Sequence, residues 1–69
     1  NPATDEVYFK WNEEEFPDTI DVFDAAGKLV MTFAERLNKI NISNLKPGNY
    51  VIRAVTRDNI HTFNIVKIQ

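Results

Sequence analysis

Hydrophobic and polar residues alternate along most of the chain with a period of two, the spacing of β-strands that bury one face. In the first such segment, Val7, Phe9 and Trp11 alternate with Tyr8 and Lys10. Similar segments cover residues 19–24, 29–33, 40–42, 49–57 and 60–68. Residues that favour turns separate them about every ten positions. The pattern predicts an all-β protein, an Ig-like antiparallel β-sandwich of about six to seven short strands.

The second and third of these segments are expected to form a β-hairpin. A two-residue Ala26-Gly27 loop would connect them, because its glycine tolerates the positive φ that tight turns require. This loop places Ile20 opposite Phe33 and Val22 opposite Met31, all on one face. Asp21 then faces Thr32 on the other face, and this separation of apolar from polar pairs supports the register.

The last two segments are expected to form a second hairpin around an Asp58-Asn59 loop. This loop pairs Ala54 with Phe63 and Ile52 with Ile65, all facing the core. The strand-forming residues in both segments are rich in β-branched side chains, which favour strands.

A turn that contains Pro47 and Gly48 precedes this hairpin. Proline fixes its own φ, and Gly48 permits a left-handed residue, so the chain can reverse here. Tyr50 follows the turn and is expected to pack inward, with its hydroxyl group reaching a polar edge.

The face of the second hairpin that points away from the core is unusually apolar. Val51, Val55, Val66 and Ile68 fall on it. Such a face is either covered by another sheet or available as a docking surface. The chain also ends on this hairpin, at residues 65–69, and a terminal strand with unpaired backbone can add to the sheet of a partner.

The size and charge of the chain exclude several classes of function. It has 69 residues, no cysteine and a formal net charge of −2. These values indicate one small domain without disulfides or thiolate zinc sites. A nucleic-acid module would show a basic stripe, and a membrane span would need a longer apolar run. No signal peptide leads the chain, so we expect any export signal upstream, in a longer protein.

Few residues carry candidate chemistry. His61 is the single histidine, so a cysteine–histidine metal cluster is excluded, and no Ser/His/Asp order is found. Asp18, Asp21 and Asp24 recur every third residue, whereas a calcium loop needs ligands at alternate positions. Both glycines stand singly in turns, unlike a phosphate-binding loop. We therefore expect no enzyme activity, no cofactor and no metal.

Four segments carry motifs that occur in this order in one protein family. They are the opening Asn1-Pro2-Ala3-Thr4-Asp5, which alone would be expected to start a turn or helix, then Ile20 to Val30, Ile42 to Val51, and Phe63 to Ile68. Together they resemble the type A C-terminal sorting domain of the type IX (Por) secretion system. The resemblance covers the whole chain. The tyrosine and proline that usually precede the opening motif are missing, and Gln69 replaces a more basic ending.

The resemblance implies that residues 1–69 are a single sorting domain whose cargo and linker lie upstream of this chain. Such a domain directs its cargo from the periplasm across the Gram-negative outer membrane to the cell surface or extracellular space, where a sortase removes it. Its partners would be the type IX translocon, shuttle and surface sortase components and the attached cargo. Nucleic acid and membrane insertion are not expected, and a weak homodimer stays open.

The resemblance also implies which residues serve sorting. The opening motif marks where the linker of the cargo joins. We expect Gly48 and Tyr50 to set the shape of the domain, and the last strand and the apolar outer face of its hairpin to dock on the translocon or its shuttle. These residues are Asn1, Pro2, Ala3, Gly27, Gly48, Tyr50, Ile65, Val66, Lys67 and Ile68.

The alternative function is an Ig-like accessory module that binds carbohydrate or protein at the cell surface. Trp11 and Tyr8 would then form a sugar-stacking platform. Their alternate positions direct them to opposite faces, so Trp11 is instead expected in the core beside Val7 and Phe9. An inert spacer is a third interpretation.

Overall fold

The computed structural model describes residues 2–3, 5–13 and 16–69. Short β-strands joined by turns and loops make up this part of the chain. The strands are β1 (Pro2–Ala3), β2 (Glu6–Tyr8), β3 (Thr19–Asp24), β4 (Leu29–Phe33), β5 (Lys39–Asn41), β6 (Gly48–Val55) and β7 (Ile60–Lys67). Among the described residues, no helix has the length and hydrophobicity needed to cross a membrane.

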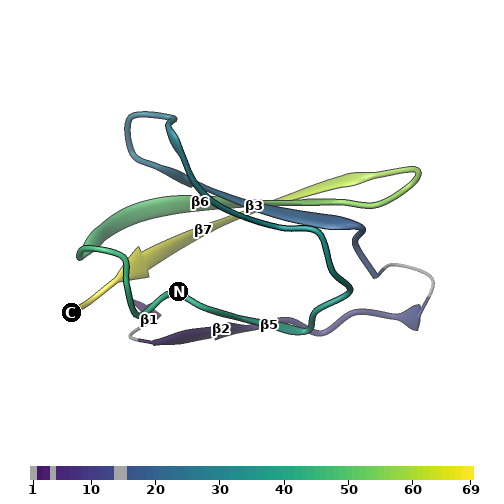
Figure 1. Ribbon diagram of the computed structural model, residues 1–69, viewed down its shortest axis with the longest axis horizontal. Helices are drawn as coiled ribbons and strands as arrows, with labels where there is room; N and C mark the ends of the chain where they lie inside the picture. Colours follow the sequence, from purple (N-terminus) through teal and green to yellow (C-terminus); the bar gives the residue numbers. More distant parts are fainter. Residues whose placement is uncertain (1, 4, 14–15) are drawn as a thin grey trace.

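The strands form two facing sheets (Figure 1). The larger sheet has the order β1-β7-β6-β3-β4, and the smaller sheet pairs β2 with β5. Neighbouring strands are antiparallel except for β1 and β7, which run parallel. The predicted all-β antiparallel sandwich is therefore confirmed, with one parallel pair added.

The core lies between the two sheets. Alternate residues of β3, β6 and β7 face inward, as the period-two pattern predicts, and β5 contributes from the opposite sheet. The buried hydrophobic residues are Ile20, Val22, Ile40, Ile42, Tyr50, Ile52, Ala54 and Ile65. Most are β-branched, and burying each aliphatic side chain stabilises the fold by about 1.5–3 kcal/mol.

The β3–β4 hairpin has the predicted register but a longer loop. Val22 lies opposite Met31, and the two pairs before it also match the prediction. The register then shifts by one residue, so the loop holds three residues, Ala25 to Gly27, instead of two. Gly27 has a φ of +83°. The Asp24 Oδ1 atom accepts two hydrogen bonds from backbone N–H groups of the turn, which stabilises it.

The β6–β7 hairpin turns one residue earlier than predicted. Its two-residue loop is Arg57-Asp58 instead of Asp58-Asn59. Moving the turn by one residue shifts the register by two, so Ile52 lies opposite Phe63. Because strand faces repeat every two residues, every side chain keeps its predicted face. The predicted register is wrong, but the division into inner and outer faces is right. Phe63 lies on the inner face as predicted, yet it is 37% exposed and not part of the buried core.

The opening of the chain forms a strand instead of starting a turn or helix. Pro2 lies opposite Val66 and Ala3 opposite Lys67, in the parallel pair with β7. Proline fits here because β1 is an edge strand. At these two positions the last strand is paired, contrary to the expectation of an unpaired terminal strand. Asn1 lies outside the described residues.

The first predicted strand is shorter than expected. β2 ends at Tyr8, and the next N–H group, of Phe9, donates to the Asn38 carbonyl oxygen at 2.7 Å. The Trp11 Nε1–H group donates to the Leu37 carbonyl oxygen at 3.1 Å. The Phe9 and Trp11 rings stack with centroids 5.2 Å apart and pack against the core, which confirms the predicted core position of Trp11.

Candidate functional site

Most of the described residues that the sequence predicts to serve sorting converge at one end of the sandwich. Lys67, the last residue of β7, lies opposite Gly48 on β6 and Ala3 on β1. Asp24, which precedes the β3–β4 loop, lies opposite Tyr50. The C-terminus also lies at this end (Figure 1). We call this region the terminal end, made up of β1 and residues 24–28, 46–50 and 66–68.

Gly48 and Tyr50 shape the terminal end. Gly48 has a φ of +154°, a conformation that residues with a side chain rarely adopt. Tyr50 is buried, as predicted, and its hydroxyl group donates to the carbonyl oxygen of Lys46. This hydrogen bond ties the strand to the turn that contains Pro47. A shallow hollow separates this turn from the β3–β4 loop.

From Ile65 to Ile68, at the end of β7 and just after it, buried and exposed side chains alternate. Ile65 and Lys67 are 4% and 1% exposed, whereas Val66 and Ile68 are 42% and 48% exposed. A buried side chain has no surface to offer a partner. The sequence predicts that all four residues serve recognition. Of these, Val66 and Ile68 have side chains that a partner can contact in the folded domain.

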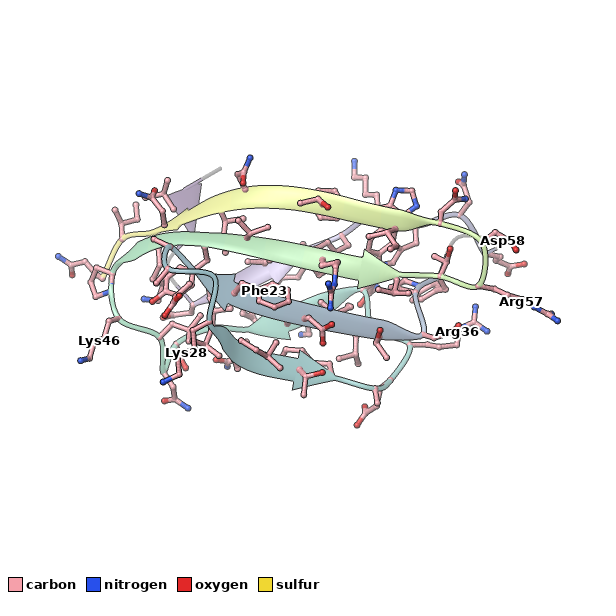
Figure 2. All side chains as sticks on the ribbon, turned by 90° about the horizontal axis from the view of Figure 1, so that it is seen from above. Phe23, Lys28, Arg36, Lys46, Arg57 and Asp58 are labelled. Carbon is pink, nitrogen blue, oxygen red and sulfur yellow. The ribbon has the colours of Figure 1, made fainter. Side chains whose placement is uncertain are left out.

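Val66 belongs to an apolar strip on the outer face of the larger sheet. Figure 2 looks onto this face and labels Phe23. Val51 lies opposite Phe23 on β3, and a shallow groove runs between Val51 and Val66. We call Phe23, Val51 and Val66 the outer strip. The Arg53 guanidinium lies over the Phe23 ring at 4.9 Å and pairs with Asp21 at 3.1 Å, so an ion pair borders the strip.

Phe23 was missing from the predicted outer face, although the sequence contains the signal for it. In β3 the buried residues are Ile20 and Val22, so alternation directs Phe23 outward. Val55, which was predicted for this face, is half-buried and follows the same alternation in β6.

A polar hollow lies at the opposite end of the sandwich. Its lining includes Glu13, Asp18, Arg36, Arg57, Asp58 and His61. The His61 Nε2 atom is buried and has no hydrogen-bond partner among the described residues. In the same part of the chain, no three His, Cys, Asp or Glu side chains are grouped to hold a metal ion. Asp21 and Asp24, which were considered for calcium, bond to Thr32, Arg53 and the turn amides instead.

The aromatic side chains do not form a joint exposed platform. Tyr8 is exposed on the smaller sheet, whereas Trp11 is half-buried. The Trp11 ring contacts the rings of Phe9 and Phe63, with centroids 5.2 Å and 5.9 Å apart. A sugar ring would have to displace these neighbours to stack on that face of Trp11.

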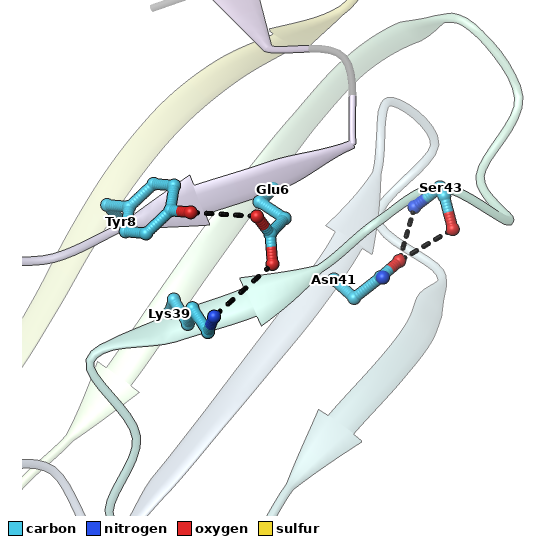
Figure 3. Close-up of polar contacts among 5 residues, drawn as sticks. All are labelled: Glu6, Tyr8, Lys39, Asn41 and Ser43. Atoms are coloured by element: carbon cyan, nitrogen blue, oxygen red, sulfur yellow. Dashed lines mark hydrogen bonds and ion pairs between the residues drawn. The ribbon is translucent and has the colours of Figure 1, made fainter.

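Tyr8 instead forms a polar group with Glu6 and Lys39 (Figure 3). The Tyr8 hydroxyl donates to Glu6 Oε1 at 2.8 Å, and Lys39 Nζ lies 3.7 Å from Glu6 Oε2. The hydrogen bond to Glu6 and the charge of its carboxylate raise the pKa of Tyr8 above its ordinary value of 10.0. The hydrogen bond is therefore present at neutral pH and is lost as the pH rises through the raised pKa.

Replacing Glu6 by alanine is expected to lower the pKa of Tyr8 toward its ordinary value, because the acceptor and the negative charge are both removed. Titration of the tyrosinate absorbance measures this pKa, and subtracting the titration of Tyr8→Phe isolates the signal of Tyr8. An unchanged Tyr8 titration in Glu6→Ala would contradict the contact.

Searches for similar proteins place the chain in a family. No curated protein and no solved structure matches it. A family model described as a secretion system C-terminal sorting domain matches residues 1–68. The matched range includes both sheets and the terminal end. The chain therefore belongs to the family of secretion system C-terminal sorting domains, the sorting signals of type IX secretion.

Proposed function

We propose that the domain is the C-terminal secretion signal of a longer protein. A cargo attached N-terminally crosses the inner membrane, and the type IX machinery then carries it from the periplasm across the outer membrane. A surface sortase removes the domain and leaves the cargo at the cell surface or in the extracellular space. The observation that carries this proposal is the match of the sorting-domain family to residues 1–68.

In this role the domain is a ligand and not a catalyst. The family is not a known enzyme family. A sorting signal has to keep its shape and present a surface that a receptor recognises. The aliphatic core between the two sheets supports the first requirement, and the exposed apolar side chains of the larger sheet support the second.

Ile68 and the outer strip, which includes Val66, form the proposed contact with the translocon or its shuttle. Val66 and Ile68 leave large apolar areas in water, and burying such area gains about 25 cal/mol per Å². Both lie at the terminal end, where the family motifs converge. A receptor that binds at the terminal end would contact the residues that the family motifs share.

The double replacement Val66→Asp and Ile68→Asp is expected to abolish export of a cargo that carries this domain. Burying unpaired carboxylates in an apolar interface costs several kcal/mol, whereas both side chains are exposed in the free domain, so its fold should survive. The measurement is the fraction of a fused reporter that reaches the surface, in cells with and without a working type IX translocon. Circular dichroism of the purified variant checks that it is folded.

The matched control is Tyr8→Asp with Ile60→Asp. It adds the same charge at two exposed hydrophobic positions outside both the outer strip and the terminal end, so export should be normal. Equal loss of export in both variants would show that the added negative charge causes the effect, whatever the position of the substituted residues. Normal export of a folded Val66→Asp, Ile68→Asp variant would refute the docking surface. Retention of the domain on the mature surface protein, detected by intact mass, would favour an accessory module.

A further inference from the structure

β7 is paired along the whole of one edge, whereas on its other edge the described residues form only one short strand pair. Antiparallel pairing with β6 extends over its whole length, from Ile60 to Lys67. On the other side, the described part of β1 pairs with Val66 and Lys67 alone. Most of this edge therefore has no described strand beside it.

The polar backbone groups of β7 that face this edge can be identified from the hairpin. The Thr56 N–H group donates to the Asn59 carbonyl oxygen at 2.8 Å, which makes these two residues a hydrogen-bonded pair. Pairs alternate along an antiparallel ladder, so Ile60 and Thr62 belong to pairs whose N–H and C=O groups point away from β6. Val66 has the same parity and is the residue that Pro2 of β1 aligns with. Ile60 and Thr62 thus present hydrogen-bonding groups to an additional strand.

The direction of β1 indicates which segment can pair there. Pro2 aligns with Val66 and Ala3 with Lys67, so each step back along β1 is one step back along β7. In this register, the five residues that precede Asn1 in a longer protein would lie opposite residues 60–64 of β7, one for each. No reversal of the chain is needed, because the parallel strand only continues in its own direction.

We propose that the residues directly preceding Asn1 extend β1 as a parallel edge strand along β7. This inference deepens the proposed function and depends on it, because it requires a cargo joined to the N-terminus. The five added residues would cover roughly 16 Å at about 3.3 Å per residue. That is about half of the 33 Å long axis of the molecule. The linker then leaves the domain near the Arg57-Asp58 turn, and the terminal end with Val66 and Ile68 stays clear of the cargo.

Hydrogen–deuterium exchange of the full-length protein with its own cargo tests this inference. Among the five residues before Asn1, every second amide would point toward β7. These amides are expected to exchange about tenfold or more slowly than those of linker residues farther upstream, because they join the sheet. Equal exchange rates in the two parts of the linker would overturn the inference.

A matched pair of variants at Thr62 tests the edge itself. Thr62→Pro removes the outward N–H group without taking a hydrogen bond from β6, and proline is tolerated at strand edges. The slow exchange of the five residues should disappear in Thr62→Pro and persist in Thr62→Ala. Persistence in a folded Thr62→Pro protein would contradict the proposed pairing.

A second variant keeps the test valid if Thr62→Pro does not fold. Replacing the five residues by glycine and serine should speed exchange of the β7 peptide that contains Thr62, while the same replacement farther upstream should not. Unchanged exchange would refute the inference, and protection that depends on protein concentration would assign the edge to a second copy of the chain. Export of the reporter is measured separately, so normal export with an unprotected linker refutes this inference and leaves the proposed function standing.

Discussion

Replacing Ile52 by alanine is expected to destabilise the domain by about 2–5 kcal/mol. Ile52 is completely buried in the middle of β6, opposite Val22 on β3 and Phe63 on β7. Truncation to alanine leaves a cavity between the two sheets. The strand pairs hold the surrounding backbone in place, so the neighbouring residues cannot move in to fill it. A domain of this size has a total stability of only about 3–10 kcal/mol, so a large fraction of the variant should be unfolded. Urea denaturation followed by circular dichroism measures the loss.

Ile60→Ala provides the control for this prediction. It makes the same chemical change in the neighbouring strand β7, but Ile60 is 64% exposed. Its effect on the free energy of unfolding should stay within about 0.5 kcal/mol. Similar losses in the two variants would contradict the division into a buried inner face and an exposed outer face.

That division is the part of the fold that the sequence predicts best. In β3, the alternation of Ile20 and Val22 with Asp21 and Phe23 shows the two faces directly, and the structure has the same bounds for the strand. Because side chains alternate with a period of two, an error of two residues in strand pairing leaves each side chain on its predicted face. For this reason the exposed position of Val66 could be predicted even though its partner on β6 could not.

The pairing error in the β6–β7 hairpin has a local physical cause. The turn region contains no glycine, so the sequence offers no strong signal for one loop over its neighbour. In the structure, the Thr56 hydroxyl accepts a hydrogen bond from the Asn59 N–H group at 2.9 Å. This side-chain contact closes the pair Thr56–Asn59 around the loop Arg57-Asp58. A choice that depends on one hydroxyl group is not visible in a hydrophobic pattern.

The terminal end could not be predicted from periodicity at all. β1 has two residues, too few to show a pattern, and its partner β7 lies at the other end of the chain. The same holds for Gly48 and Lys67, which become neighbours only when β6 and β7 pair. The family resemblance identified the motifs, but their convergence is a property of the folded sheet.

Replacing Gly48 by asparagine is expected to destabilise the domain by about 1–3 kcal/mol, through backbone strain. The φ of Gly48 is +154°, far from the left-handed region near +57° that asparagine tolerates. Crowding does not contribute, because a Cβ atom at this position would have no neighbour within 4 Å. Urea denaturation measures the loss.

Gly27→Asn separates this strain from the general effect of removing a glycine. A Cβ atom at Gly27 also meets nothing within 4 Å, but the φ of +83° lies close to the left-handed region. The cost of Gly27→Asn should therefore be smaller, at most about 1 kcal/mol. Equal costs at the two positions would show that φ does not decide the requirement for glycine. Because Gly48 begins β6 opposite Lys67, its strain acts on the strand pair that holds the terminal end together. In Gly48→Asn, local unfolding should therefore begin at the terminal end, and the amides of residues 65–67 should exchange faster than those of the β3–β4 hairpin.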